Sequence, residues 1–286
     1  METREIKYDD ATCNRAMVFS ADQKTDITFV CLPAMGVRAS YYESFATRLC
    51  SAGFNVVTAD WRGHGHSSVR ASRTTDFGYE QIISDVKKLI DYTTDWFPTT
   101  QKVVIGHSLG GQIGSLFAAR YQDSLSGLIL ITACSVYYKG WDVSTSYKLR
   151  FAGNVFHPIS KMIGYFPGIK IGFGGRESRT VIRDWSHNAL SGNYVLTNSK
   201  YNYEEALQKL AKPVLSISVE NDRLASKLAV ENLYRKFGHQ SAVSHQHLGS
   251  SETKLSPLTH FSWAKKPDYF VKMIEKWTQH NLPKQA

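Results

Sequence analysis

Residues 102–111 read KVVIGHSLGG, a mostly apolar run in which Ser108 lies between Gly106 and Gly110. Residues 102–105 are typical of a strand, and residues 108–121 are typical of a helix. A chain that turns this tightly from a strand into a helix needs glycine beside the turn residue, because larger side chains would collide with the backbone. The pattern G-x-S-x-G in this context predicts that Ser108 is held in a strained conformation at the carboxyl edge of a sheet.

Strands and helices alternate on both sides of this turn. The continuous apolar run at residues 27–32 predicts a strand covered on both faces. Helical spacing over 41–49 and a short strand at 55–58 then complete a strand-helix-strand unit, which implies parallel pairing. Further helices are predicted over 79–97, 224–237 and 267–279, and further strands over 128–132, 214–219 and 242–247. The sequence therefore predicts an α/β protein with a doubly wound, mostly parallel sheet.

Residues 135–200 interrupt this alternation. No run in this segment is typical of a sheet strand, and the segment is rich in aromatic residues and glycine. It holds nine basic and three acidic residues, so it carries most of the formal net charge of +9. We predict a core made of residues 1–134 and 201–286, with residues 135–200 as a mainly helical insertion.

Composition excludes several classes of protein. The 34 basic and 25 acidic residues are scattered, without the patterns of nucleic-acid-binding motifs, so no nucleic-acid partner is expected. The four cysteines lie far apart, which argues against disulfides and zinc. Residues 1–10 are polar and acidic, unlike a secretion signal, and the longest apolar run, residues 128–134, is too short to span a bilayer. These features predict a cytoplasmic protein without stable membrane insertion.

A serine nucleophile needs a base, and the base usually needs an acid that orients it. Asp222 follows the predicted strand at 214–219, where a carboxylate can reach the catalytic edge. A second interpretation of Asp222 is the N-cap of the next helix. Glu220 is the alternative acid, but it belongs to the strand or its first turn and is expected to point elsewhere.

The base is expected on a loop after the last strand. His260 lies between the strand at 242–247 and the final helix, which makes it the predicted base. His247 is the alternative, although His245 and His247 alternate along the strand and are expected to decorate its face. Three histidines precede the acid in the chain, contrary to the order Ser, acid, His expected in this fold: His64, His66 and His107.

Together these residues resemble the α/β-hydrolase superfamily, of the monoglyceride lipase-like and serine-aminopeptidase-like kind. Residues 60–67, DWRGHGHS, match the family's D-x-R-G-x-G-x-S loop, which packs beneath the active site and supports the turn. His260-Phe261 is similar to the family's terminal histidine followed by an aromatic residue. The resemblance implies that residues 135–200 form a cap over the catalytic edge, whose aromatic residues either line an acyl or aryl pocket or pack the cap on the sheet.

The oxyanion hole shows one departure from the family. Relatives usually carry His-Gly after the first central strand, whereas this chain has Pro33-Ala34 within LPAMG, residues 32–36. By that matching, the backbone N–H of Met35 joins the N–H of Leu109 as a donor, with Ala34 as the alternative to Met35. Proline lacks an N–H but can stiffen the loop that presents the next ones.

The predicted function is a serine hydrolase that acts on a small-molecule carboxylic ester through Ser108, His260 and Asp222. A thioester or an amide is a less favoured substrate. This chemistry needs no metal, nucleotide or redox cofactor. The basic residues of the insertion point to an acidic substrate or leaving group, such as a phosphate-bearing thioester. Two alternatives remain: an acyltransferase that uses the same triad, and a non-catalytic ligand-binding protein on the same fold.

Overall fold

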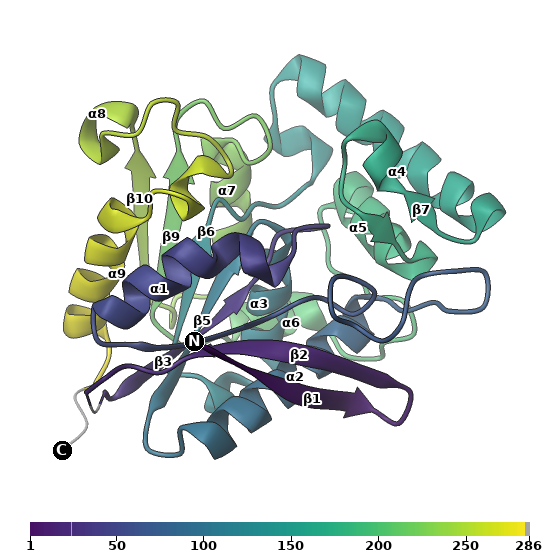
Figure 1. The fold of residues 1–286 in the computed structure, drawn as a ribbon. Helices are drawn as coiled ribbons and strands as arrows, with labels where there is room; N and C mark the ends of the chain where they lie inside the picture. Colours follow the sequence, from purple (N-terminus) through teal and green to yellow (C-terminus); the bar gives the residue numbers. More distant parts are fainter. Residues whose placement is uncertain (24, 284–286) are drawn as a thin grey trace.

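An eight-stranded sheet forms the centre of the molecule in the computed structural model, which describes residues 1–23 and 25–283 (Figure 1). The strand order is β1-β2-β4-β3-β5-β6-β9-β10. The strands are β1 (Glu2–Asp9), β2 (Thr12–Phe19), β3 (Ile27–Leu32), β4 (Asn55–Ala59), β5 (Gln101–His107), β6 (Gly127–Ile131), β9 (Val214–Val219) and β10 (Val243–Leu248). The strands from β4 to β10 in this order pair in parallel, which confirms the predicted mostly parallel sheet.

The N-terminal strands β1 and β2 were not predicted from the sequence. They form an antiparallel hairpin that joins the sheet where β2 pairs with β4. Most residues of β1 are exposed, with Ile6 and Tyr8 facing the core. An edge strand of this kind has too few apolar residues to produce a clear pattern of alternation.

Helices cover both faces of the sheet, as a doubly wound fold requires. The helices outside the 135–200 segment are α1 (Glu43–Ser51), α2 (Tyr79–Trp96), α3 (Leu109–Arg120), α6 (Tyr203–Gln208), α7 (Lys227–Tyr234), α8 (Ser250–Thr253) and α9 (Asp268–Asn281). Buried side chains of α2, α3, α6 and α7 share one apolar cluster, whereas those of α1 and α9 belong to the cluster on the opposite face. The helix predicted over 224–237 is shorter in the structure, because α7 begins only after Ser226 caps it.

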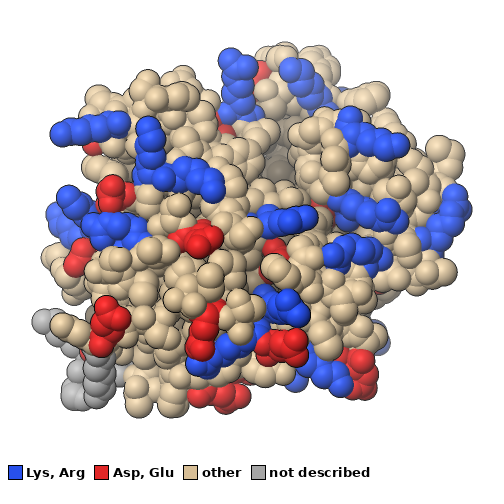
Figure 2. All heavy atoms as spheres, viewed as in Figure 1, with Lys and Arg blue, Asp and Glu red and all other residues tan. Residues whose placement is uncertain are grey.

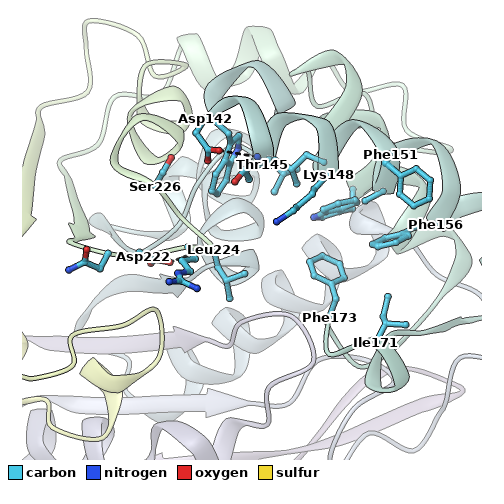
Figure 3. Close-up of a pocket in the computed structure, with 17 residues that line it drawn as sticks. Asp142, Thr145, Lys148, Phe151, Phe156, Ile171, Phe173, Asp222, Leu224 and Ser226 are labelled. Atoms are coloured by element: carbon cyan, nitrogen blue, oxygen red, sulfur yellow. Dashed lines mark hydrogen bonds between the residues drawn. The ribbon is translucent and has the colours of Figure 1, made fainter.

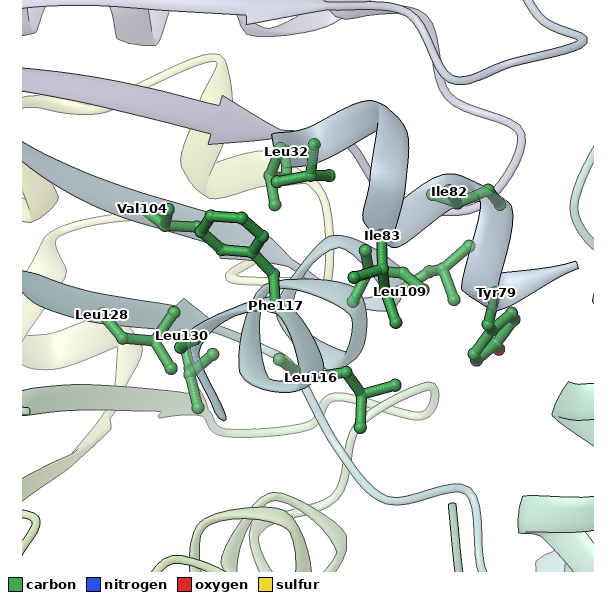
Figure 4. Packing of buried hydrophobic residues seen from close by; sticks show 14 of the residues in the cluster. Leu32, Tyr79, Ile82, Ile83, Val104, Leu109, Leu116, Phe117, Leu128 and Leu130 are labelled. Atoms are coloured by element: carbon green, nitrogen blue, oxygen red, sulfur yellow. The ribbon is translucent and has the colours of Figure 1, made fainter. Parts of the chain in front are cut away.

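Helix α3 anchors the nucleophile turn in the core. Every residue of α3 from Leu109 to Ala119 is buried. Phe117 and Leu116 belong to the same cluster as Val104 of β5 and Leu128 of β6 (Figure 4). Burying a side chain of this size stabilises the fold by about 1.5–3 kcal/mol. The position of Ser108 at the start of α3 is therefore fixed by the packing of the whole helix.

Residues 135–200 lie between β6 and the strand β9 and add no strand to the large sheet. They contain α4 (Val143–Ile163) and α5 (Arg179–Ser191), which pack against each other beside the sheet (Figure 1). Helix α4 begins where the Asp142 carboxylate accepts the N–H of Thr145 and ends at Gly164, whose φ is 100°. The segment also contains β7 (Phe166–Pro167) and β8 (Arg176–Glu177), a short pair that the sequence did not predict.

Candidate active site

The turn between β5 and α3 has the strained geometry expected of a nucleophile turn. Ser108 has φ 54° and ψ −117°, a conformation that side-chain-bearing residues rarely adopt. A Cβ on Gly106 would lie 2.4 Å from the carbonyl oxygen of Gly110, and a Cβ on Gly110 would lie 2.2 Å from that of Leu32. Both glycines are therefore required by close backbone packing. The Ser108 side chain remains partly exposed at the end of β5.

Asp222 and His260 form a buried hydrogen-bonded pair. His260 Nδ1 lies 2.8 Å from Asp222 Oδ2, and the side chains are 6% and 0% exposed. The other carboxylate oxygen of Asp222 accepts the N–H groups of Leu224 and Ala225, at 2.8 and 2.9 Å. The N-cap of α7 is Ser226, so the alternative capping role does not fall to Asp222. A carboxylate held in this way favours a proton on Nδ1 and leaves Nε2 of His260 free to accept one.

The alternative acid and base have other partners. Glu220 accepts the N–H of Ser250, the first residue of α8, at 2.6 Å. His245 and His247 lie on the same face of β10, and both contact the hydroxyl of Ser218, at 3.0 and 2.8 Å. These three side chains therefore belong to the β9–β10 edge of the sheet and not to the Asp222–His260 pair.

The turn that carries Ser108 is adjacent to this pair at His107, the residue before Ser108. The ring of His107 is 4.7 Å from the ring of His260, measured between centroids. Within the described part of the chain, Ser108 Oγ makes no hydrogen bond. Catalytic hydrogen bonds are often long before substrate binds, so this geometry is compatible with a Ser108–His260 interaction.

His107 and Tyr42 form a buried cluster that sequence reasoning missed. Tyr42 Oη lies 2.6 Å from His107 Nδ1 and accepts the N–H of Ala34 at 2.9 Å. Burial, followed by the adjacent His260, holds the pKa of His107 well below its ordinary value, so its imidazole is neutral. In the sequence, Tyr42 was one of several apolar positions with helical spacing, and that spacing gave no sign of a polar role.

For the ester hydrolysis that the sequence predicts, Tyr42→Phe is expected to lower kcat about tenfold while KM changes less than about twofold. The change leaves the buried Nδ1 of His107 and the N–H of Ala34 without a partner, which costs about 1–3 kcal/mol. His107 precedes Ser108 and Ala34 precedes Met35, and Ser108 and Met35 are the residues expected to contact the reacting carbonyl. Steady-state kinetics and thermal unfolding check this result. The matched control is Tyr92→Phe, which removes a hydroxyl bonded to Lys7 at the surface. Unchanged kcat in Tyr42→Phe would contradict the prediction.

The same cluster bears on the oxyanion donors. The N–H of Ala34 is already donated to Tyr42 Oη. In the part of the chain that the structure describes, the N–H of Met35 has no acceptor. The N–H of Leu109 is the first of α3 and has no intrahelical acceptor. Of the two candidates on the loop after β3, Met35 is therefore the one whose donor is available.

The D-x-R-G-x-G-x-S loop supports the loop after β3. Trp61 Nε1 donates to the carbonyl of Pro33 at 2.9 Å, and the Asp60 carboxylate accepts the N–H of Ala39 at 2.8 Å. Arg62 is buried and makes two hydrogen bonds to Asp85 of α2, at 2.6 and 2.8 Å. The bonds of Trp61 and Asp60 hold the loop that carries Met35, and the Pro33 carbonyl of this loop packs closely against Gly110 of the serine turn.

Two contacts join the 135–200 segment to the core beside Met35. A Cβ on Gly36 would lie 2.4 Å from the backbone of Gly174, so the two main chains touch directly. His64 Nε2 lies 3.1 Å from a carboxylate oxygen of Glu177, and the Glu177 side chain is almost completely buried. Burial would lower the pKa of His64, but the facing carboxylate outweighs it and raises the pKa above 6.5. Burial would likewise raise the pKa of Glu177, and His64 outweighs it and lowers the pKa below 4.5.

Glu177→Gln is expected to lower the melting temperature most between pH 4.5 and 6.5. The contribution of His64 is complete below its unfolded pKa of 6.5 and disappears as the pH rises through the raised folded value. The contribution of Glu177 is complete above 4.5 and disappears as the pH falls through the lowered folded value. Thermal unfolding of both proteins at a series of pH values checks this. A melting-temperature difference that is the same at pH 5.5 and 9 would refute it.

A cavity of about 1050 Å³ opens between the 135–200 segment and the loop that carries Asp222 (Figure 3). Asp222 lines this cavity, whereas Ser108 and His260 do not. Phe156 stacks on Trp185 and also contacts Phe173, with ring centroids 5.9 and 5.6 Å apart, so these aromatics both line the cavity and pack the segment together. Its apolar wall consists mainly of Trp141, Leu149, Phe156, Phe173, Trp185 and Leu224.

Metal-binding clusters and membrane-spanning helices are absent from the described ranges 1–23 and 25–283. No group of three or more His, Cys, Asp or Glu side chains there is arranged to hold a metal ion. No helix in these ranges has the length and hydropathy needed to cross a bilayer.

The sheet order, the strained serine turn and the Asp222–His260 pair together define an α/β-hydrolase fold. A family model described as serine aminopeptidase, S33, matches residues 23–171, which is more than half of the chain. The chain belongs to this family.

Individual relatives match parts of the chain. The monoacylglycerol lipase of Mycolicibacterium smegmatis is 33% identical over 92 residues, which cover 32% of this chain and 32% of that protein. The chain thus spans about a third of the length of that relative. The bifunctional esterase/perhydrolase DCH of Acinetobacter calcoaceticus is 25% identical over 195 residues, covering 60% and 66%. The structure of Est1E from Butyrivibrio proteoclasticus with ferulic acid covers 95% of this chain and 97% of its own, with a TM-score of 0.64 and 14% identity. The last comparison shows the shared fold alone.

Proposed function

We propose that the protein is a serine hydrolase that cleaves carboxylic esters through an acyl-enzyme on Ser108. The observation that carries the proposal is the buried 2.8 Å contact between His260 Nδ1 and Asp222 Oδ2 beside the strained Ser108 turn. The matches to a lipase and an esterase support an ester as the substrate.

In the proposed reaction, Ser108 Oγ attacks the acyl carbonyl while His260 Nε2 takes its proton. Asp222 holds the imidazole in the required tautomer and stabilises its charge as it becomes an imidazolium. The N–H groups of Leu109 and Met35 donate to the oxyanion of the tetrahedral intermediate. His260 then returns the proton to the leaving alcohol, and a water attacks the acyl-enzyme in a second cycle of the same steps.

We further propose that residues 135–200 act as a cap and that the cavity beneath them receives part of the substrate. Apolar walls with a few polar groups are typical of small-molecule sites. Transfer of the acyl group to an alcohol or amine would use the same residues. We favour hydrolysis over transfer only because the matched relatives are a lipase and an esterase. Product analysis with added alcohols and amines separates free acid from transferred acyl group.

A fluorophosphonate probe tests the proposal directly. Such probes phosphonylate a serine only when a neighbouring base has activated it. The expected result is one labelled peptide that contains Ser108, with labelling lost after denaturation. A native protein that is not labelled would overturn the proposed chemistry and favour a non-catalytic ligand-binding protein.

A further inference from the structure

Helix α4 is exposed over most of its surface. Of its 21 residues, from Val143 to Ile163, three are buried: Ala152, Gly153 and Ser160. One side of α4 packs against α5 and lines the cavity, and the other side faces solvent (Figure 1). The solvent-facing side of a helix on a globular protein is normally polar.

The solvent-facing side of α4 is apolar instead. Val143, Tyr147 and Phe151 follow one another at intervals of four residues, which places them on one face of the helix. Met162 lies about three helical turns after Phe151 and falls on the same face. All four side chains are between 66% and 74% exposed. Single exposed apolar residues are normal, but several large ones gathered on one helix face mark an interaction surface.

Exposed apolar surface continues from α4 around the opening of the cavity. Ile171 and Leu224 come from two other segments, and both line the cavity together with Phe151 (Figure 3). All three side chains are more than half exposed, so they lie where the cavity opens to solvent. The apolar side of α4 and the opening of the cavity therefore share one region of the surface.

Basic side chains border this apolar region. Within residues 139–171 there are five basic residues but one acidic residue, Asp142. The other carboxylate near the opening, that of Asp222, is buried against His260. Figure 2 shows lysine and arginine side chains around the hollow in the upper half of the molecule. Five exposed cations lie beside the apolar residues, and none has a carboxylate oxygen within 4.0 Å in the described ranges: Lys148, Arg150, Lys161, Lys170 and Arg223.

We propose that this region docks reversibly on a lipid surface rich in anionic head groups, with α4 lying along the interface. Tyr147 and Phe151 then reach the boundary between head groups and acyl chains, as the apolar face of an interfacial helix does. Lys148 and Arg150 remain at the level of the lipid phosphates, because long basic side chains extend their charge toward the polar side. Docking of this kind needs no spanning helix and does not depend on the chemistry at Ser108.

A lipid surface fits this region better than an acidic protein does. The exposed apolar side chains, from Val143 to Met162, lie on the outer, convex side of a helix and extend over about five turns. A protein partner needs a complementary concave surface to cover them, whereas fluid lipid adapts to a convex face. When the region is docked, the opening of the cavity faces the lipid.

Sedimentation with lipid vesicles tests this inference. We expect vesicles of equal parts phosphatidylcholine and phosphatidylglycerol to bind the protein at least about tenfold more tightly than vesicles of phosphatidylcholine alone, and added salt to weaken the binding. The double variant Tyr147→Ser/Phe151→Ser should lose affinity for the mixed vesicles by about tenfold. Both side chains are exposed, so its melting temperature should stay close to that of the wild type.

Matched lysine variants separate docking from a general attraction of a basic protein to anionic lipid. Lys148→Gln/Lys161→Gln should lower the affinity for the mixed vesicles by about tenfold, because each lysine near the surface contributes to binding. The control is Lys272→Gln/Lys276→Gln, which removes two exposed lysines from α9, away from the 135–200 segment (Figure 1). This control should bind within about twofold of the wild type.

Three results would overturn the inference: no binding to the mixed vesicles, unchanged affinity in Tyr147→Ser/Phe151→Ser, or equal losses in the two lysine pairs. A protein that ignores both kinds of vesicle but binds immobilised polyglutamate through Lys148 and Lys161 would indicate an acidic protein partner and overturn the lipid assignment too. No ester is present in these assays, so their outcome is independent of the proposed reaction.

Discussion

Ser108→Ala is expected to lower kcat for p-nitrophenyl ester hydrolysis by about four to six orders of magnitude. The hydroxyl is the proposed nucleophile, and the remaining groups can only assist direct attack by water. The substitution removes one oxygen from a partly exposed side chain that makes no hydrogen bond among the described residues. The stability of the fold should therefore change little.

Circular dichroism and thermal unfolding serve as controls for Ser108→Ala. The variant should keep the wild-type spectrum and a melting temperature within a few degrees, since its backbone turn is held by Gly106 and Gly110. Near wild-type turnover by a folded Ser108→Ala protein would overturn the assignment of the nucleophile.

Asp222→Asn is expected to lower kcat by about three to four orders of magnitude, with only a small change in KM. The amide oxygen can still accept the N–H groups of Leu224 and Ala225, so the loop keeps its shape. The amide NH₂ then faces His260 Nδ1 and favours a proton on Nε2, where it blocks acceptance of the serine proton. Steady-state kinetics on the purified variant measures this loss.

Glu220→Gln is the matched control for Asp222→Asn. Glu220 follows β9 as Asp222 does, but it accepts the N–H of Ser250 at the start of α8. Its neutralisation should leave kcat within about twofold of wild type, as is usual for surface changes. A loss of similar size in both variants would show that charge near β9, and not the orientation of His260, controls the rate.

The centre of the sheet could be predicted because strands β3, β5, β6 and β9 each contain a short, buried apolar run. Val214–Val219 is an example, since all six residues are buried and the predicted and observed bounds agree. The β1–β2 hairpin escaped prediction because its outer strand is largely solvated and holds only two core residues. The β7–β8 pair escaped because two residues on each side give no periodicity.

The candidate site shows the same division. Ser108, Asp222 and His260 were predicted as site residues from their places after strands, because sequence order preserves this property of the topology. The role of Tyr42 depends on a hydroxyl that reaches across 65 residues to His107, and no local pattern reports such a contact. The cavity likewise depends on which side chains of α4 face a loop some 75 residues later, as with Lys148 and Arg223.

The contact between Gly36 and Gly174 has a consequence for how molecules reach the serine. With no side chain between the two backbones, and the His64–Glu177 pair beside them, the 135–200 segment is closed against the core on the Met35 side. If the 135–200 segment moved outward there, the buried His64 and Glu177 side chains would separate, at a considerable cost in free energy. We therefore expect substrate to enter and product to leave on the opposite side, between α4 and the Asp222 loop. The exposed ring of Phe151 lines the cavity there and would limit the width of the opening.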